Sequence, residues 1–290
     1  MNRRRFLAIS AAFAALPAGA RAETWRGYAL GAEASVTLHG PRAQVARAFD
    51  AIPARLQQIE RLFSLYDPQS ALTRLNAEGQ LMQPDALFLE LLSHCEQIHT
   101  LTDGTFDPTV QVLWQALASD LPMGQAREHI GWSRVQHHTA GVTLAPGQSL
   151  TFNGIAQGFA TDLITADLKG LGFTANTLVH IGEFSALGGP FRIGIEDPDA
   201  GLVGYRTLKN RALATSSPNA TRLGHASHLM DPQGRAPLWS TVTVEADSAT
   251  LADGLSTAAV FLPPDHLAWF SRQTNYRITA IDPQGDVVTL

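Results

Sequence analysis

Apolar residues recur at helical spacing in several parts of the chain. They fall every three or four positions over residues 44–63, where Pro53 predicts a kink, and again over residues 85–101. A stripe of this kind is typical of a helix face that packs on a core. The same reasoning predicts helices over 154–171, 248–261 and 265–272.

Strand patterns separate these helices. Residues 24–39 alternate between apolar and polar side chains, and further strands are expected over 134–136, 142–144, 150–152, 177–181, 184–187, 191–195, 203–208, 212–215, 239–246, 276–281 and 287–290. Runs of strands and helices without strict alternation favour an α+β fold over a doubly wound parallel sheet. No repeat or linker divides residues 23–290, so we expect one large domain of two closely joined lobes with mixed sheets and flanking helices.

The first 22 residues have the pattern of an export signal. Arg3-Arg4-Arg5-Phe6-Leu7 is a twin-arginine motif, an apolar run follows, and Ala20-Arg21-Ala22 is a peptidase site, which predicts a mature chain from Glu23. The alternative is an uncleaved membrane anchor, but Ser10 and Pro17 interrupt the run, which is shorter than the roughly 18 residues of a membrane span. We therefore expect a periplasmic protein without stable membrane insertion.

Composition narrows the classes of partner. The signal contains four of the 21 basic residues and no acidic one, so the mature chain has 17 basic and 26 acidic residues, a net charge of −9. This charge disfavours nucleic acid as a partner, and an anionic nucleotide would need a metal ion or local amides to bind. The single cysteine, Cys95, lies in an apolar helical stretch and is expected to be a buried hydrophobic residue.

Polar residues with candidate chemistry gather in six short segments in loop-like positions. The backbone after Asn153-Gly154 could present N–H groups to a phosphate, although an ordinary strand-to-helix turn has the same pattern. Tyr66 and the polar run to Asn76 could stack on a flat ring, or Tyr66 could simply pack at a helix end. The segments cover residues 63–76, 102–110, 152–162, 180–183, 214–217 with 228–234, and 252–258.

Two of the segments contain residues suited to metal binding and proton transfer. Asp253 and Thr257 are four apart on a predicted helix, so their oxygens could bind Mg²⁺ beside a nucleotide's phosphates. Alternatively, the pair could cap the helix or simply face solvent, since Asp253 is near the helix start. His228 precedes a turn sequence and could act as a general base, or it could be a partly buried histidine that the turn satisfies.

In this order and spacing, the six segments resemble the ApbE family of FAD:protein FMN transferases over about residues 28–281. The resemblance implies an α+β fold that binds FAD with Mg²⁺ and transfers FMN onto a threonine hydroxyl of an acceptor protein, releasing AMP. The segments that carry it include FDPTV (106–110), NGIAQGFATD (153–162), HLMDPQG (228–234) and ADGLSTA (252–258).

The resemblance also implies roles for single residues. Asp253, Thr257 and the carbonyl of Gly154 match the family's metal site, and His228 matches its proposed base. The segments that contact FAD include Tyr66, Asn76, Asp107, Thr215, Ser216, Gln157 and Glu183.

Three positions depart from the family pattern. Gln157 replaces the usual lysine, Glu183 aligns with the aspartate of a Gly-Gly-Asp motif, and Thr151 replaces a common aspartate. These departures resemble a periplasmic branch associated with nitrous-oxide respiration, NosX, and would make the membrane flavoprotein NosR the acceptor. Two alternatives remain. Loss of the lysine would also fit an FAD-binding assembly factor without transfer activity. If water replaced the threonine hydroxyl as the nucleophile, the protein would be an FAD pyrophosphatase giving FMN and AMP.

Overall fold

The computed structural model describes residues 11–12, 22–223 and 226–290. The twin-arginine motif and most of the expected signal lie outside the described residues. Among the residues that are described, no helix combines the length and apolar character that crossing a membrane requires.

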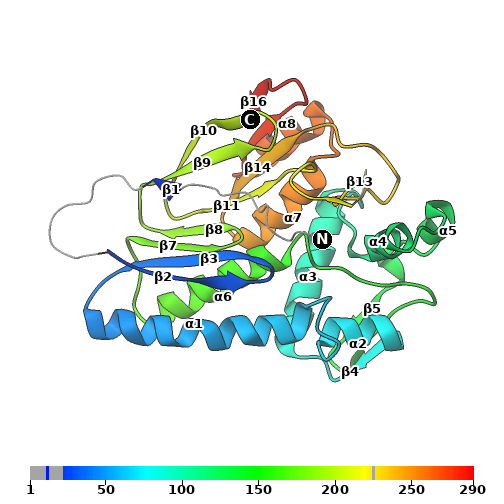
Figure 1. Ribbon diagram of the computed structural model, residues 1–290, viewed down its shortest axis with the longest axis horizontal. Coiled ribbons are helices and arrows are strands. Elements are labelled where there is room, and N and C mark those ends of the chain that lie inside the picture. The colour runs from blue at the N-terminus through cyan, green and yellow to red at the C-terminus, as the bar shows by residue number, and fades with distance from the viewer. Residues whose placement is uncertain (1–10, 13–21, 224–225) are drawn as a thin grey trace.

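An eight-stranded sheet forms the centre of the molecule, and all its pairings are antiparallel (Figure 1). The strand order is β16-β15-β14-β11-β8-β7-β3-β2. An antiparallel sheet with separate runs of helices confirms the predicted α+β class. The strands are β2 (Ala22–Ala29), β3 (Ala32–His39), β7 (Thr177–Ile181), β8 (Phe184–Leu187), β11 (Ala212–Ser216), β14 (Thr241–Ala246), β15 (Arg277–Ile281) and β16 (Val287–Thr289).

The two faces of this sheet belong to different cores. Val179 and Ile181 of β7 belong to the main core, whereas Leu178, which directly precedes Val179, belongs to a second core. This division follows from the alternation of side chains along a strand. The second core includes residues of β9 (Phe191–Asp197) and β10 (Gly201–Leu208), which form a three-stranded sheet with β1 (Ala11–Ala12).

Helices cover the main-core face of the sheet. α6 (Ala156–Gly170) and α7 (Ala249–Ala259) pack against each other and on the central strands, with α1 (Arg42–Phe63) against α6 and α3 (Ala86–Leu101) against α7. α1 runs below the sheet in Figure 1, and α8 (Pro264–Gln273) packs on β15. The buried residues Ile52, Leu56 and Ile59 of α1 have the predicted helical spacing.

Smaller elements complete the chain. A second three-stranded sheet has the order β4-β6-β5, next to α2, and a short hairpin pairs β12 with β13. Their bounds are α2 (Ala71–Glu78), β4 (Gln80–Met82), η1 (Pro108–Val110), α4 (Gln111–Ala118), α5 (Met123–Arg127), η2 (Trp132–Arg134), β5 (Gln136–His138), β6 (Gly141–Thr143), β12 (Arg222–Leu223) and β13 (Ala226–Ser227).

Three local predictions were wrong. The segment 63–76 is not all loop, because α2 begins within it at Ala71, capped by Ser70. Residues 150–152 form no strand: both backbone groups of Leu150 bond to the side-chain amide of Asn76, which replaces a neighbouring strand. The expected strand at 134–136 begins only at Gln136, since η2 occupies the preceding residues.

Candidate functional site

Seven of the eleven predicted site residues gather where the start of α6, the end of β11 and the middle of α7 meet. The Thr257 hydroxyl lies 3.3 Å from the carbonyl oxygen of Gly154 and 3.4 Å from the Ser216 hydroxyl. Gly154 packs closely on this threonine, because a Cβ built at Gly154 would lie 2.8 Å from Thr257 Oγ1. The segments that the sequence places about 100 residues apart therefore form one cluster.

Asp253 is buried one helical turn before Thr257 on α7. Its Oδ2 accepts a hydrogen bond of 2.9 Å from the backbone N–H of Gly158 in the first turn of α6. Burial raises the pKa of Asp253 to about 7, the Gly158 N–H partly offsets this, and the charge of Asp162 adds to it. A carboxylate with so few partners in an apolar setting favours a cation beside it.

A second buried carboxylate, Glu183, lies near Asp253. Its Oε2 accepts a hydrogen bond of 3.1 Å from the N–H of Thr215. Burial and the charge of Asp253 raise the pKa of Glu183 well above its usual range, although the Thr215 N–H lowers it. The two acids thus oppose each other's ionisation, and a bound cation would relieve this repulsion.

Gln157 packs over the glycine before Glu183. A Cβ at Gly182 would lie 2.8 Å from both Cγ and Nε2 of Gln157, and the φ of +89° at Gly182 also favours glycine. The neutral amide of Gln157 therefore lies against the backbone that leads into Glu183.

These oxygens suit Mg²⁺. Magnesium takes oxygen ligands at about 2.0–2.1 Å in an octahedron, which places neighbouring ligand oxygens roughly 3 Å apart. The 3.3 Å between Thr257 Oγ1 and the Gly154 carbonyl is close to this spacing, and Asp253 supplies the charge. Within the described ranges, no group of three or more His, Cys, Asp and Glu side chains could hold a metal ion. The cluster is therefore a mixed set of carboxylate, hydroxyl and carbonyl.

Sequence reasoning missed the residue that fixes the start of α7. Asp162 of α6 accepts hydrogen bonds from the backbone N–H groups of Ala249 and Thr250 and from the hydroxyls of Ser248 and Thr250, at 2.6–2.9 Å. It thus caps α7 together with Ser248 and holds in place the helix that carries Asp253. Asp162 ended one of the quoted segments, but only the folded structure shows its partner.

Ser256 was also missed. Its hydroxyl lies 2.8 Å from that of Ser216 and donates to the carbonyl of Asp253 at 3.0 Å. The bond between the two serine hydroxyls joins β11 to α7 across 40 residues. A serine between Asp253 and Thr257 carries no signal of this contact in the sequence.

Three predicted residues lie on other segments. Tyr66 is 82% exposed, so its ring is open to a ligand. Asn76 uses its amide to bond both backbone groups of Leu150, and Asp107 caps η1 and accepts from the N–H of Trp132 at 3.2 Å. Asn76 and Asp107 therefore shape loops in this structure.

His228 lies on the segment that follows β11. Its Nδ1 is 2.8 Å from the carbonyl oxygen of Thr221, and its own carbonyl accepts from Trp114 Nε1 at 2.9 Å. Burial lowers the pKa of His228, while the carbonyls of Thr221 and Pro218 partly offset this. Because a carbonyl only accepts, Nδ1 carries the proton of the neutral ring and Nε2 has the basic lone pair.

No hydrogen bond among the described residues joins His228 to Asp253 or Thr257.

Cys95 is buried in α3, as predicted. Burial raises the pKa of its thiol well above the usual range, and the negative charges of Asp107 and Glu96 raise it further. The thiol therefore stays protonated.

Known proteins resemble this chain over most of its length. FAD:protein FMN transferase from Haemophilus influenzae is 26% identical over 274 residues, which cover 81% of this chain and 78% of that protein. The protein of the same name from Chlamydia muridarum is 27% identical over 244 residues, covering 74% and 76%.

Solved structures share the fold. The apo flavinyl transferase ApbE of Pseudomonas stutzeri is 28% identical with a TM-score of 0.79, covering 93% of this chain and 94% of that one. Flavin transferase ApbE from Vibrio cholerae has a TM-score of 0.82 at 21% identity, covering 94% and 97%. A sequence model described as the ApbE family matches residues 30–281. The chain therefore belongs to the ApbE family.

Proposed function

We propose that this protein is a Mg²⁺-dependent FAD:protein FMN transferase that modifies a threonine hydroxyl of an acceptor protein. The observation that carries the proposal is the contact between the Thr257 hydroxyl and the Gly154 carbonyl, one helical turn after the buried carboxylate of Asp253, which accepts from the N–H of Gly158. The names of the two curated relatives support the same activity.

The reaction is a phosphoryl transfer, in which positioning and charge stabilisation supply most of the catalysis. The threonine oxygen forms a bond to the phosphorus of the FMN half, the bridging P–O bond of FAD breaks, and AMP leaves with the bridging oxygen. His228 takes the threonine's proton at Nε2 while the Thr221 carbonyl holds Nδ1. Bound Mg²⁺ would neutralise charge on the pyrophosphate.

Other residues of the cluster orient the substrate. Thr215 and Ser216 lie at the end of β11. The hydroxyl of Ser256 bonds to the hydroxyl of Ser216, and the carboxylate of Glu183 accepts from the N–H of Thr215. Tyr66 is exposed and can stack on a flavin or adenine ring. Gln157 adds no positive charge at this position, so bound Mg²⁺ would have to neutralise more of the phosphate charge.

We also propose that the protein acts in the periplasm after export by the twin-arginine route, with residues 23–290 as the transferase domain. Its acceptor would then be a membrane flavoprotein of nitrous-oxide respiration, similar to NosR, with a threonine-containing flavinylation motif. The twin-arginine motif and the departures at Gln157 and Glu183 support this assignment.

One incubation separates the candidate activities. The mature protein is mixed with FAD and Mg²⁺, with and without the candidate acceptor, and the products are followed by mass spectrometry and nucleotide chromatography. A transferase gives acceptor that carries FMN together with AMP, and Asp253→Ala or EDTA abolishes this product. Free FMN and AMP without acceptor would identify a pyrophosphatase, and bound but intact FAD would identify an assembly factor.

A further inference from the structure

The His228 segment, residues 228–235, is held by side chains from three neighbouring elements. Trp114 of α4 donates to the carbonyl of His228 at 2.9 Å, and Arg127 of α5 donates to the carbonyl of Pro232 at 3.0 Å. Arg235 donates from Nη2 to the hydroxyl of Thr105 at 3.0 Å, in the loop between α3 and η1. Of these three links, only the last starts from a side chain of the segment itself.

Asp231 closes the turn within this segment. Its Oδ2 accepts from the backbone N–H groups of Gln233 and Arg235, both at 2.9 Å. Its Oδ1 accepts from Nε and Nη2 of the Arg235 guanidinium, at 3.0 and 2.5 Å. The Asp231 side chain is fully buried, so the pair with Arg235 supplies the counter-charge that burial demands.

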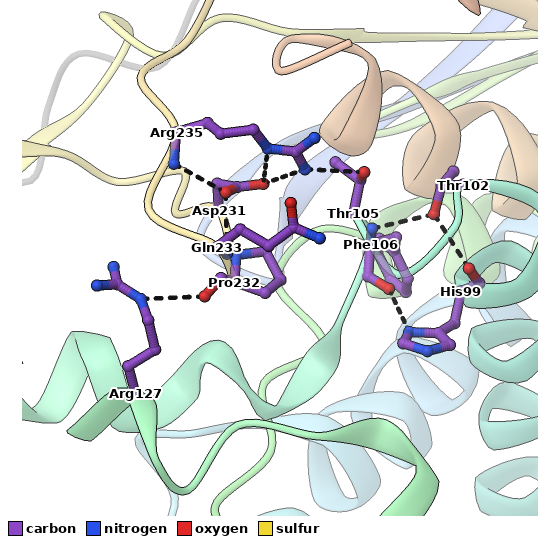
Figure 2. A network of polar contacts seen from close by, with 9 residues as sticks. All are labelled: His99, Thr102, Thr105, Phe106, Arg127, Asp231, Pro232, Gln233 and Arg235. Carbon is purple, nitrogen blue, oxygen red and sulfur yellow. Dashed lines mark hydrogen bonds and ion pairs between the residues drawn. The ribbon is translucent and has the colours of Figure 1, made fainter. Parts of the chain in front are cut away.

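The loop that receives Arg235 is itself fixed on α3. The hydroxyl of Thr102 accepts from the N–H of Phe106 at 3.0 Å, and the carbonyl of Phe106 lies 2.9 Å from Nδ1 of His99 (Figure 2). Figure 2 shows Arg235 between Asp231 on one side and Thr105 on the other. The guanidinium therefore connects the turn to a loop whose backbone is tied to a core helix.

We propose that Arg235 is a positioning residue for FMN transfer: by joining Asp231 to Thr105, it fixes the His228 segment against the loop between α3 and η1. The inference rests on the proposed function, in which His228 is the base. Only two residues separate His228 from Asp231, so a shift of the turn moves the imidazole. A misplacement of about 1 Å at a reacting group can cost on the order of 100-fold in rate.

Two variants test the link between Arg235 and Thr105 without creating a cavity in the core. Thr105→Val keeps the shape of the buried side chain and removes only the hydroxyl that accepts from Arg235. Arg235→Lys keeps the charge but has no planar fork for two partners. Arg55→Gln is the matched control, since Arg55 also forms a two-bonded ion pair, with Asp167, and links α1 to α6 away from the His228 segment.

The readouts are steady-state transfer with FAD and acceptor, FAD affinity, and amide hydrogen exchange of the mature protein. We expect both test variants to lower kcat on the order of 10-fold, with KM for FAD within about 2-fold and faster exchange over 228–235. Arg55→Gln should change none of these. Wild-type kcat and wild-type exchange in both test variants would overturn the inference.

The design separates this inference from the proposed function. If the wild-type protein transfers no FMN to any acceptor, the proposed function fails, and exchange over 228–235 alone decides whether Arg235 fixes the segment. If transfer proceeds and only exchange changes, the positioning role is refuted, because the segment would then loosen without cost to the reaction.

Discussion

Gly158 lies where α6 crosses α7, and replacing it by alanine should directly disturb the proposed Mg²⁺ site at Gly154, Asp253 and Thr257. A Cβ at this position would lie 2.7 Å from Cβ of Asp253 and 2.7 Å from the carbonyl carbon of Ala249, and closer still to that carbonyl's oxygen. Ordinary contact begins at 3.4 Å, so the helices must separate by about 0.7 Å or more. Two backbones meet here, and neither can yield by a change of rotamer.

The expected cost follows from overpacking. Extra methyl groups in a packed core destabilise by about 1–3 kcal/mol, and a backbone clash belongs at the upper end of that range. A loss of about 3 kcal/mol corresponds to a fall in Tm of roughly 6–12 °C for a domain of this size. Because the N–H of Gly158 donates to Asp253, the shift also changes the carboxylate's position, and Mg²⁺-dependent FAD affinity should weaken.

Gly170 offers a matched control in the same helix. A Cβ there meets nothing within 4 Å, so Gly170→Ala should stabilise by about 0.5 kcal/mol through helix propensity alone. Both variants are compared by thermal unfolding and by FAD titration with and without Mg²⁺. A Gly158→Ala protein with wild-type Tm and wild-type FAD affinity would refute the idea that this crossing fixes the site.

Three further predictions concern pH, catalysis and export. Burial raises the pKa of Asp253 to about 7 in the folded, metal-free protein, whereas in the unfolded chain this carboxyl loses its proton near the ordinary aspartate pKa of 3.8. The protein's free energy of unfolding should therefore fall by a few kcal/mol as pH rises from about 4 to about 7, and denaturant titrations in EDTA should show a shallower fall in Asp253→Asn. His228→Ala should slow transfer by roughly 10²–10⁴-fold with little change in FAD affinity, measured in single turnovers; a wild-type rate would make the histidine structural. Changing Arg3 and Arg4 together to lysine should retain precursor in the cytoplasm on fractionation, and normal periplasmic accumulation would contradict the assigned route.

Local sequence signals predicted those elements that their own residues determine. α3 and α7 begin after capping side chains, Asp85 and Ser248, and their apolar spacing matched the helices closely. α2 has comparable capping residues, because Ser70 precedes it and Gly79 follows it with a φ of +72°. Its polar residues were nevertheless assigned to a loop.

Distant partners explain what the sequence could not show. The stretch 150–152 has apolar residues typical of a strand, yet the amide of Asn76, 74 residues earlier, takes the hydrogen bonds of Leu150. Likewise, the sequence placed Asp253 and Thr257 on one helix face, but the repulsion between Asp253 and Glu183 arises only when the turn between β7 and β8 comes near α7. A single residue's type and spacing carry no information on such pairings.

The cap that α6 provides to α7 has a consequence for how the protein folds. Asp162 reaches the start of α7 across 86 residues of chain, so the helix that carries Asp253 lacks part of its N-terminal stabilisation until this long loop closes. Contacts of such sequence separation form slowly compared with local helix formation. We therefore expect the proposed Mg²⁺ site to form late in folding, after most of the helical circular-dichroism signal has returned and once α6 and α7 have docked.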